Sequence, residues 1–201
     1  MRDESFNAFK CAIKGITPPP YGAVEHTNTS QRPILTVLDS FSFECFSPEE
    51  NTIPVTPVDY AEAMDYYSPE MLIVESAWQG SAGSWTHQLV GSTGPKPAYF
   101  DMIKAARDRD IPVVFWNKED PPHFEDFLPV AKEADLVLTT AGELVDKYKA
   151  ETGHDHVGVL AFAAQPLIHH PFGRSDDESD VCFAGQYFAH KYPERRQQME
   201  Y

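Results

Sequence analysis

The sequence predicts an α/β protein whose main domain, residues 32–170, is a Rossmann-like, doubly wound parallel sheet. Short apolar runs of four or five residues recur from residue 34 onward, and segments with helical composition separate them. This alternation is typical of βαβ units, whose parallel sheet is covered on both faces. Because crossovers between parallel strands are right-handed, the units are expected to wind into a doubly wound sheet.

The first expected elements follow one another at short intervals. Residues 34–38 form an apolar run that closes on Asp39 and Ser40, which is the pattern of a buried strand. Residues 58–67 can form a helix, although their helix propensity is mixed. Residues 71–74 are a second apolar run and therefore a second buried strand.

The middle of the domain repeats this order. A long loop with Gly and Ser, residues 80–97, leads into a helix expected over residues 98–109. Residues 113–116 are the third expected strand. Pro121 and Pro122 end it and stiffen the following turn, because proline cannot continue a β-ladder.

The last expected elements of the domain are two helices and two strands. A helix over residues 124–134 precedes a fourth strand over residues 136–139. A helix over residues 143–151 is closed by Gly153, the usual left-handed stop, and residues 157–160 form the fifth strand.

The two ends of the chain are expected to differ from this domain. Residues 1–31 form an irregular lead-in, with a short helix near residues 6–13. At the other end, residues 171–180 form a polar linker. Residues 181–201 contain a sixth strand and a helix that begins near Pro193, as at the start of a second, truncated α/β domain.

Composition excludes several functional classes. Sixteen Lys and Arg residues stand against 31 Asp and Glu, a net charge of -15, whereas nucleic acids and anionic membranes require clustered cations. The three cysteines form no CxxC pair, and neither the adjacent His169 and His170 nor the alternating His154 and His156 favour a metal site. No signal core and no apolar run of membrane-spanning length is present, so we expect a cytoplasmic protein.

The densest group of polar side chains follows the third strand. Within a few residues the chain places an amide, a cation, two carboxylates and a histidine: Asn117, Lys118, Glu119, Asp120 and His123. Ligands of open α/β sheets bind at the carboxyl ends of the strands. We therefore expect a functional loop, and the alternative is a solvated loop that is polar without a function.

Three segments carry a resemblance to a known family. They are VESAWQG at residues 74–80, FWNKEDPPHF at residues 115–124, and DVCFAGQY followed by HKYPER at residues 180–187 and 190–195. These segments resemble the amino-terminal region and the domain junction of CgeB-like glycosyltransferases, a family named for a spore maturation protein. The resemblance extends over residues 33–201.

The resemblance implies the GT-B architecture, in which two Rossmann-like domains face each other across a cleft. The amino-terminal domain of such an enzyme generally holds the acceptor, and the carboxyl-terminal domain holds most of the nucleotide-sugar donor. Residues 32–170 would then be the acceptor-side domain, and residues 181–201 would begin the donor-side domain. We expect the 201-residue chain alone to be inactive, since it lacks the remainder of that domain.

The resemblance also implies roles for individual residues. The implied co-substrate is a nucleotide sugar, the acceptor is a carbohydrate or a protein, and no metal or other cofactor is expected. The residues implied in acceptor binding are Asp39, Ser40, Trp78, Gly80, Asn117, Lys118 and Glu119. Those implied in binding the donor diphosphate are Gly185, Tyr187, Lys191 and Arg195. Glycine lets the backbone approach a phosphate and the two cations neutralise it, unless they only occupy a solvated helix face.

Glycosyl transfer also needs a base near the acceptor hydroxyl. Asp120 and His123 are candidates, although Asp120 is equally suited to cap the helix that follows. Glu75 is a third candidate, because it is expected to emerge from its strand beside Trp78. A sugar ring could stack on Trp78, and the alternative for this residue is ordinary packing over the edge of the sheet.

The remaining candidates belong to two loops. Asp39 and Ser40 either reach the same edge of the sheet or form only a strand-to-loop turn. Trp85 and His87 lie in the long loop and could close over the acceptor as a lid.

Two other functions compete with the transferase. One is a Rossmann-like module that binds a glycan or a partner without turnover. The other is a dinucleotide-dependent oxidoreductase, which the sequence disfavours because no GxGxxG follows the first strand.

Overall fold

The computed structural model describes residues 32–48, 51–91, 94–169 and 193–199. The expected lead-in, the linker and the sixth strand lie outside these residues. The chain divides into two units, Met1–His169 and His170–Tyr201, which are described separately. In the second unit, helix α7 (Pro193–Met199) begins at the expected proline.

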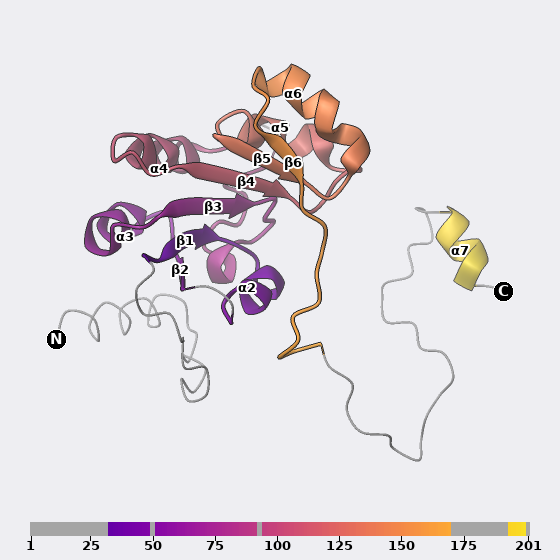
Figure 1. Ribbon diagram of the computed structural model, residues 1–201, viewed down its shortest axis with the longest axis horizontal. Helices are drawn as coiled ribbons and strands as arrows, with labels where there is room; N and C mark the ends of the chain where they lie inside the picture. Colours follow the sequence, from indigo (N-terminus) through magenta and orange to yellow (C-terminus); the bar gives the residue numbers. More distant parts are fainter. Residues whose placement is uncertain (1–31, 49–50, 92–93, 170–192, 200–201) are drawn as a thin grey trace, which may run out of the picture. The chain divides into compact units, whose positions relative to one another are not determined.

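The first unit is built on a six-stranded, all-parallel sheet in the order β2-β1-β3-β4-β5-β6 (Figure 1). Its strands are β1 (Ile34–Val37), β2 (Thr52–Pro54), β3 (Met71–Glu75), β4 (Val113–Asn117), β5 (Leu136–Thr139) and β6 (Val157–Val159). All five strands expected before residue 170 are confirmed. The order reverses beside β1, since the chain first runs out to β2 and then returns to β3, and such a switch point is the usual ligand site of an open α/β sheet.

Helices flank this sheet, and the Rossmann-like α/β class is confirmed. They are α2 (Ser40–Phe46), α3 (Tyr60–Tyr67), α4 (Pro97–Arg107), α5 (Phe124–Ala131) and α6 (Val145–Thr152), with 3₁₀ turns η1 (Ser81–Gly83) and η2 (Gly142–Leu144). The four helices expected between residues 58 and 151 are confirmed with small shifts at their ends. Gly153 ends α6 at φ 78°, the left-handed conformation predicted for it.

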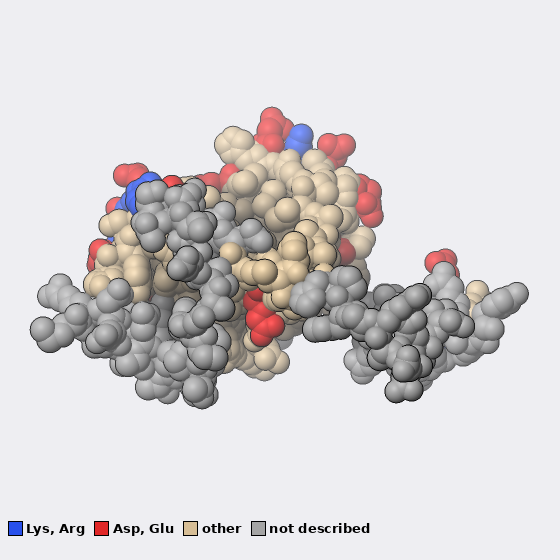
Figure 2. Space-filling model, turned by 60° about the horizontal axis from the view of Figure 1, so that its bottom comes forward, with Lys and Arg blue, Asp and Glu red and all other residues tan. Residues whose placement is uncertain are grey.

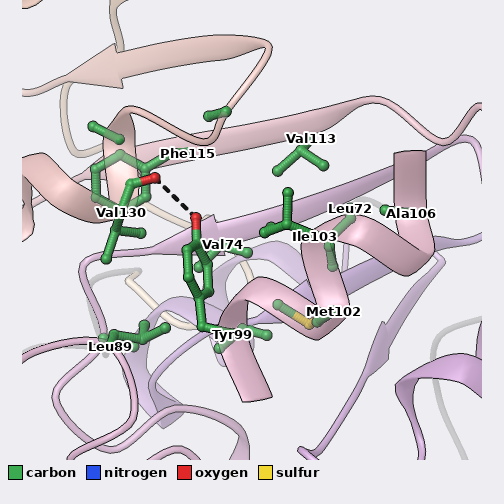
Figure 3. Close-up of a cluster of buried hydrophobic side chains, with 14 of the residues drawn as sticks. Leu72, Val74, Leu89, Tyr99, Met102, Ile103, Ala106, Val113, Phe115 and Val130 are labelled. Carbon is green, nitrogen blue, oxygen red and sulfur yellow. Dashed lines mark hydrogen bonds between the residues drawn. The ribbon is translucent and has the colours of Figure 1, made fainter. Parts of the chain in front are cut away.

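The main core lies between one face of the sheet and helices that include α3, α4 and α5. Alternate residues of neighbouring strands, such as Val74 and Phe115, point into it (Figure 3). The Phe115 ring stacks against Phe127 of α5 with centroids 6.4 Å apart. Tyr99 of α4 is completely buried, and its hydroxyl donates to the Val130 carbonyl over 2.8 Å. This bond fixes α4 against α5, because a buried hydroxyl without a partner is costly.

Trp116 faces the opposite side of the sheet. Its ring lies 5.8 Å from that of Phe46 in α2, and its indole nitrogen donates to the Leu160 carbonyl over 2.9 Å. Glu75 is paired with Trp116 in the strand register and therefore points to the same side. We call this side the α2 face of the sheet.

Helix α2 and strand β2 were not predicted from the sequence. Helix α2 has the sequence SFSFECF, whose first four residues alternate as in a strand and whose aromatic residues have low helix propensity. Strand β2 is only three residues long and ends in Pro54. Proline is tolerated there because β2 pairs only with β1 and so lies at the edge of the sheet.

The loop over residues 80–97 does not provide the expected aromatic lid. Trp85 is 0% exposed, and its indole nitrogen donates to the Val55 carbonyl over 2.8 Å. The expectation for Trp85 was wrong because the loop folds back onto the core. His87, the other expected lid residue, is exposed and has φ 60°.

The surface carries few clustered cations on the face that Figure 2 shows. Acidic side chains lie along its upper margin and also near its middle, and Lys and Arg gather into no large patch among the coloured residues. Within the described part of the chain, no helix combines the length and the apolar character that a membrane crossing requires.

Candidate functional site

Three charged residues meet at the carboxyl ends of neighbouring strands. Asp39 follows β1, Glu75 ends β3 and Lys118 follows β4. Although they are far apart in the sequence, the parallel pairing of β1 with β3 and of β3 with β4 brings them together. We refer to Asp39, Glu75 and Lys118 as the Lys118 cluster. It occupies the switch point of the sheet, where α/β proteins bind ligands.

Lys118 lies between the two carboxylates. Its Nζ is 3.2 Å from Asp39 Oδ2 and 3.1 Å from Glu75 Oε1. The main-chain nitrogen of Asp39 also donates to Glu75 Oε1 over 2.5 Å. The side chain of Lys118 is only 9% exposed and that of Glu75 is completely buried, so water screens these charges little.

The loop after β3 closes around the Asp39 carboxylate. The main-chain amides of Trp78, Gln79 and Gly80 donate to it over 3.3, 3.1 and 2.7 Å. Gly80 has φ 54°, and a Cβ atom added to it would lie 2.9 Å from the Trp85 Cβ. Gly80 is therefore required for this close approach, and Asp39 fills a concavity of amides that would otherwise suit an anion.

The surroundings shift the proton affinity of each group in the cluster. Burial raises the pKa of Glu75 above its usual value, and the nearby Lys118 opposes this only in part. Burial also acts on Asp39, but the Gly80 amide and Lys118 outweigh it and lower its pKa. For Lys118, burial favours the neutral amine, yet the charges of Glu75 and Asp39 leave its pKa raised.

This arrangement corrects two expectations from the sequence. Glu75 does not emerge toward a substrate, because its side chain is 0% exposed. Lys118 is not presented to an acceptor, since its ammonium group is bound by Asp39 and Glu75. Ser76, which was not singled out, supports the same turn: its hydroxyl accepts from the main-chain nitrogen of Lys118 over 2.9 Å.

Asp120 belongs to a second, partly buried network, which we call the Asp120 network. Its carboxylate accepts from Thr139 Oγ1 over 2.5 Å, from the Asn117 side-chain amide over 2.9 Å and from the Tyr148 hydroxyl over 3.0 Å. Asn117 also donates to the Tyr148 oxygen over 2.8 Å. These bonds join the loop after β4 to β5 and α6.

The Asp120 network changes how Asp120 and Asn117 are interpreted. The suggested helix cap is wrong, because His123 occupies the N-cap position of α5 and no side chain caps this helix. Burial raises the pKa of Asp120, and the bonds from Thr139 and Tyr148 counteract this in part. Asn117 is completely buried in the network, so it does not face an acceptor. We assign both residues to the support of the loop.

The side chains of Trp78 and His123 reach the solvent at this edge of the sheet. The Trp78 side chain is 41% exposed, and its ring meets that of His123 edge-on with centroids 5.0 Å apart. The other side of the indole packs against Phe127, 5.3 Å away. His123 Nδ1 lies 2.7 Å from a carboxylate oxygen of Asp126. This contact orients the imidazole so that Nε2 can accept a proton.

The remaining site residues predicted from the sequence are spread over several parts of the chain. Ser40 is exposed at the first position of α2, and Glu119 is half-buried, with its main-chain nitrogen bonded to Asn117 Oδ1. Gly185, Tyr187 and Lys191 lie outside the described residues, as does the side chain of Arg195 in α7. The expected donor site is therefore neither supported nor contradicted by the structure.

Sequence reasoning missed the partners that give these residues their roles. Asp126 could have been found, because it lies three residues after His123 and hence on the same side of a helix. Thr139 and Tyr148 carried no local signal, since they reach Asp120 only through the folding of β5 and α6 onto the loop.

Within the described ranges, no group of three or more His, Cys, Asp or Glu side chains is arranged to hold a metal ion. Comparisons of the chain with protein-family models, with curated proteins and with solved structures gave no match. The fold therefore defines a Rossmann-like α/β protein, and the Lys118 cluster lies at the switch point of its sheet.

Proposed function

We propose that this chain supplies the acceptor-side domain of a GT-B glycosyltransferase that uses a nucleotide sugar. The sequence resemblance to CgeB-like enzymes suggests this function, and the all-parallel sheet is compatible with it. The observation that carries the proposal is the exposed Trp78 ring beside His123, at the edge of the sheet where ligands bind.

Each exposed group has a task in this reaction. The C–H face of an acceptor sugar stacks on Trp78, because aromatic rings bury apolar surface at low conformational cost. His123 Nε2 takes the proton of the acceptor hydroxyl while its oxygen bonds to the anomeric carbon. The bond from that carbon to the nucleotide diphosphate breaks, and the diphosphate leaves with its electron pair. Asp126 stabilises the imidazolium that forms.

The buried residues support this reaction without touching the substrate. The Lys118 cluster fixes the loop that carries Trp78, through the amides bound to Asp39. The Asp120 network fixes the turn that leads to His123. This assignment replaces Glu75 and Asp120 by His123 as the proposed base.

Binding of the acceptor can be tested on this chain by saturation-transfer NMR with a panel of mono- and oligosaccharides. We expect Trp78→Ala to abolish the signals of a bound sugar. Phe100→Ala, which removes a comparably exposed ring from α4, should leave them unchanged. If no sugar gives a signal with the parent protein, or if both variants behave alike, the acceptor site is not at Trp78.

A second candidate is a glycan-binding module without turnover. The burial of Glu75 and the three bonds to Asp120 favour it, because they leave these carboxylates unavailable as bases. Calorimetry and turnover assays with UDP- and GDP-sugars separate the two functions. These assays must use a protein that joins this chain to a complete donor-side domain, because this chain alone is expected to be inactive. In that protein, sugar binding without binding or turnover of any nucleotide sugar identifies the module and contradicts the transferase.

A further inference from the structure

An apolar pocket of 380 Å³ lies on the α2 face of the sheet. Helix α2 forms one wall and residues 160–165 form the other, with Trp116 of β4 between them. Neither Trp78 nor His123 lines it. Its size is within the usual range for sites that hold a small organic molecule.

Aromatic rings dominate this pocket. The Trp116 ring lies 5.5 Å from Phe162 and 5.8 Å from Phe46, and Phe41 lies 6.4 Å from Phe162, all in edge-on arrangements. Phe41 is 55% exposed and Phe162 is 56% exposed, so these rings remain in contact with water. A flat apolar molecule between them would remove that surface from water and add edge or face contacts.

One polar group of the pocket wall accepts no hydrogen bond. Ser42 is 1% exposed, and no donor is bonded to its hydroxyl oxygen. The hydroxyl proton is directed to the nearby Glu75 carboxylate, and this contact lowers the pKa of Glu75, so the lone pairs of the Ser42 oxygen are what a ligand could bond to. Buried polar atoms without partners cost about 1–3 kcal/mol each, so a hydroxyl that bonded to Ser42 would relieve this cost.

The lining also limits what the pocket can hold. No Lys, Arg, Asp or Glu side chain is among the described residues that line it, so a nucleotide diphosphate would find no counter-charge. A sugar would leave most of its hydroxyl groups without partners. The chemistry therefore fits a ligand that is mainly apolar and carries a single polar group.

We propose that this pocket binds a small aromatic molecule with one hydroxyl group, whose ring packs against Trp116 and whose hydroxyl bonds to Ser42. This inference is independent of glycosyl transfer, because none of the proposed acceptor and base residues lines the pocket. Either proposal can fail without the other.

The test uses 2-naphthol as the probe and 2-methoxynaphthalene, which cannot donate a hydrogen bond, as its matched control. Calorimetry should show that the parent chain binds 2-naphthol more tightly than it binds 2-methoxynaphthalene. Ser42→Ala should weaken 2-naphthol binding about 5- to 10-fold, which corresponds to one hydrogen bond, and leave 2-methoxynaphthalene unchanged. Ser84→Ala, which alters a serine outside the pocket, should affect neither probe.

A second variant keeps the proposal testable if Ser42→Ala does not fold. Ala163 is an exposed residue of the pocket wall, and Ala163→Phe should fill the space and prevent binding of both probes. Failure of the parent chain to bind 2-naphthol, or equal binding by the parent and both pocket variants, would overturn the proposal.

Cys45 provides a local readout, because it lines the same pocket. Peptide-resolved alkylation with iodoacetamide should show that 2-naphthol slows the reaction of Cys45, with Cys11 and Cys182 as internal references. Unchanged labelling of Cys45 under saturating probe contradicts binding at this site. Protection of Cys45 by higher protein concentration alone would instead identify a second copy of the chain as the occupant, and would also overturn the proposal.

Discussion

Lys118 Nζ lies 3.1 Å from Glu75 Oε1, and the Glu75 side chain is completely buried. A buried carboxylate is tolerated when a counter-charge and hydrogen bonds accompany it, and removal of one partner leaves an uncompensated charge. This pair joins the end of β3 to the loop after β4. The stability of this edge of the sheet therefore depends on a buried charge pair.

Lys118→Met should lower the free energy of unfolding by about 3–5 kcal/mol, because Glu75 then remains buried without its counter-charge. Urea unfolding followed by circular dichroism measures this loss. The double variant Lys118→Met/Glu75→Gln should recover much of it. Lys132→Met breaks only the exposed pair with Glu151 and should cost less than about 1 kcal/mol. Equal losses for Lys118→Met and Lys132→Met would show that the buried pair contributes no more to stability than the exposed pair.

Asp39 should make stability depend on pH in the acid range. Its pKa is lower in the folded protein than in the unfolded chain, so below about pH 4 the unfolded chain takes up the proton more readily. The stabilisation is therefore present above the unfolded pKa and is lost as the pH falls through the folded one. Asp39→Asn should lower the free energy of unfolding at pH 7 and reduce the loss of stability between pH 7 and pH 3. Urea unfolding over this pH range measures that loss, and an unchanged loss in the variant would contradict this assignment.

Gly80→Ala should destabilise the protein by about 2–4 kcal/mol, since the new Cβ would meet Trp85 in addition to the cost of positive φ. Gly153→Ala is a matched control, because Gly153 also has positive φ but has no atom within 4 Å of the added Cβ. It should cost only about 1–2 kcal/mol. Thermal unfolding of both variants gives the comparison, and equal losses would mean that the contact with Trp85 relaxes freely.

The strands of the sheet were predictable because each can be recognised from its own residues. The run that forms β5, residues 136–139, consists of three apolar residues and a threonine between Asp135 and Thr140, so its limits follow from composition. Helix α2 was missed for the opposite reason: its rings do not follow a helical period, and contacts such as that of Phe46 with Trp116 hold it on the sheet. Tertiary packing overrides local propensity there.

The location of the candidate site was predictable, but the roles of its residues were not. Polar residues after strands indicate the carboxyl edge of a parallel sheet, and Asp39, Glu75 and Lys118 do meet there. Whether such a residue faces solvent or another side chain depends on partners far away in the sequence. Glu75 is buried against Lys118, and Asp120 is bound by Tyr148, which lies 28 residues later.

Substitution of Asp120 should mainly lower stability, whereas substitution of His123 should mainly lower activity. Asp120→Asn disturbs three partly buried hydrogen bonds and should lower the free energy of unfolding by about 1–3 kcal/mol. His123→Ala removes a partly exposed ring and should change stability by less than about 1 kcal/mol. In a protein preparation with transferase activity, His123→Ala should reduce kcat about 10²- to 10⁴-fold, as expected for the loss of a general base, and leave acceptor binding intact.

Asp126→Asn provides the control for this comparison, because it keeps the His123 ring and removes the carboxylate that orients it. We expect an intermediate loss of kcat and no loss of acceptor affinity. The pH–rate profile of each variant distinguishes a base from a residue that only packs, since only loss of the base removes the limb that its protonation causes. If Asp120→Asn abolishes turnover without a change in stability and His123→Ala retains full activity, the base is Asp120 and the assignment made from the geometry is wrong.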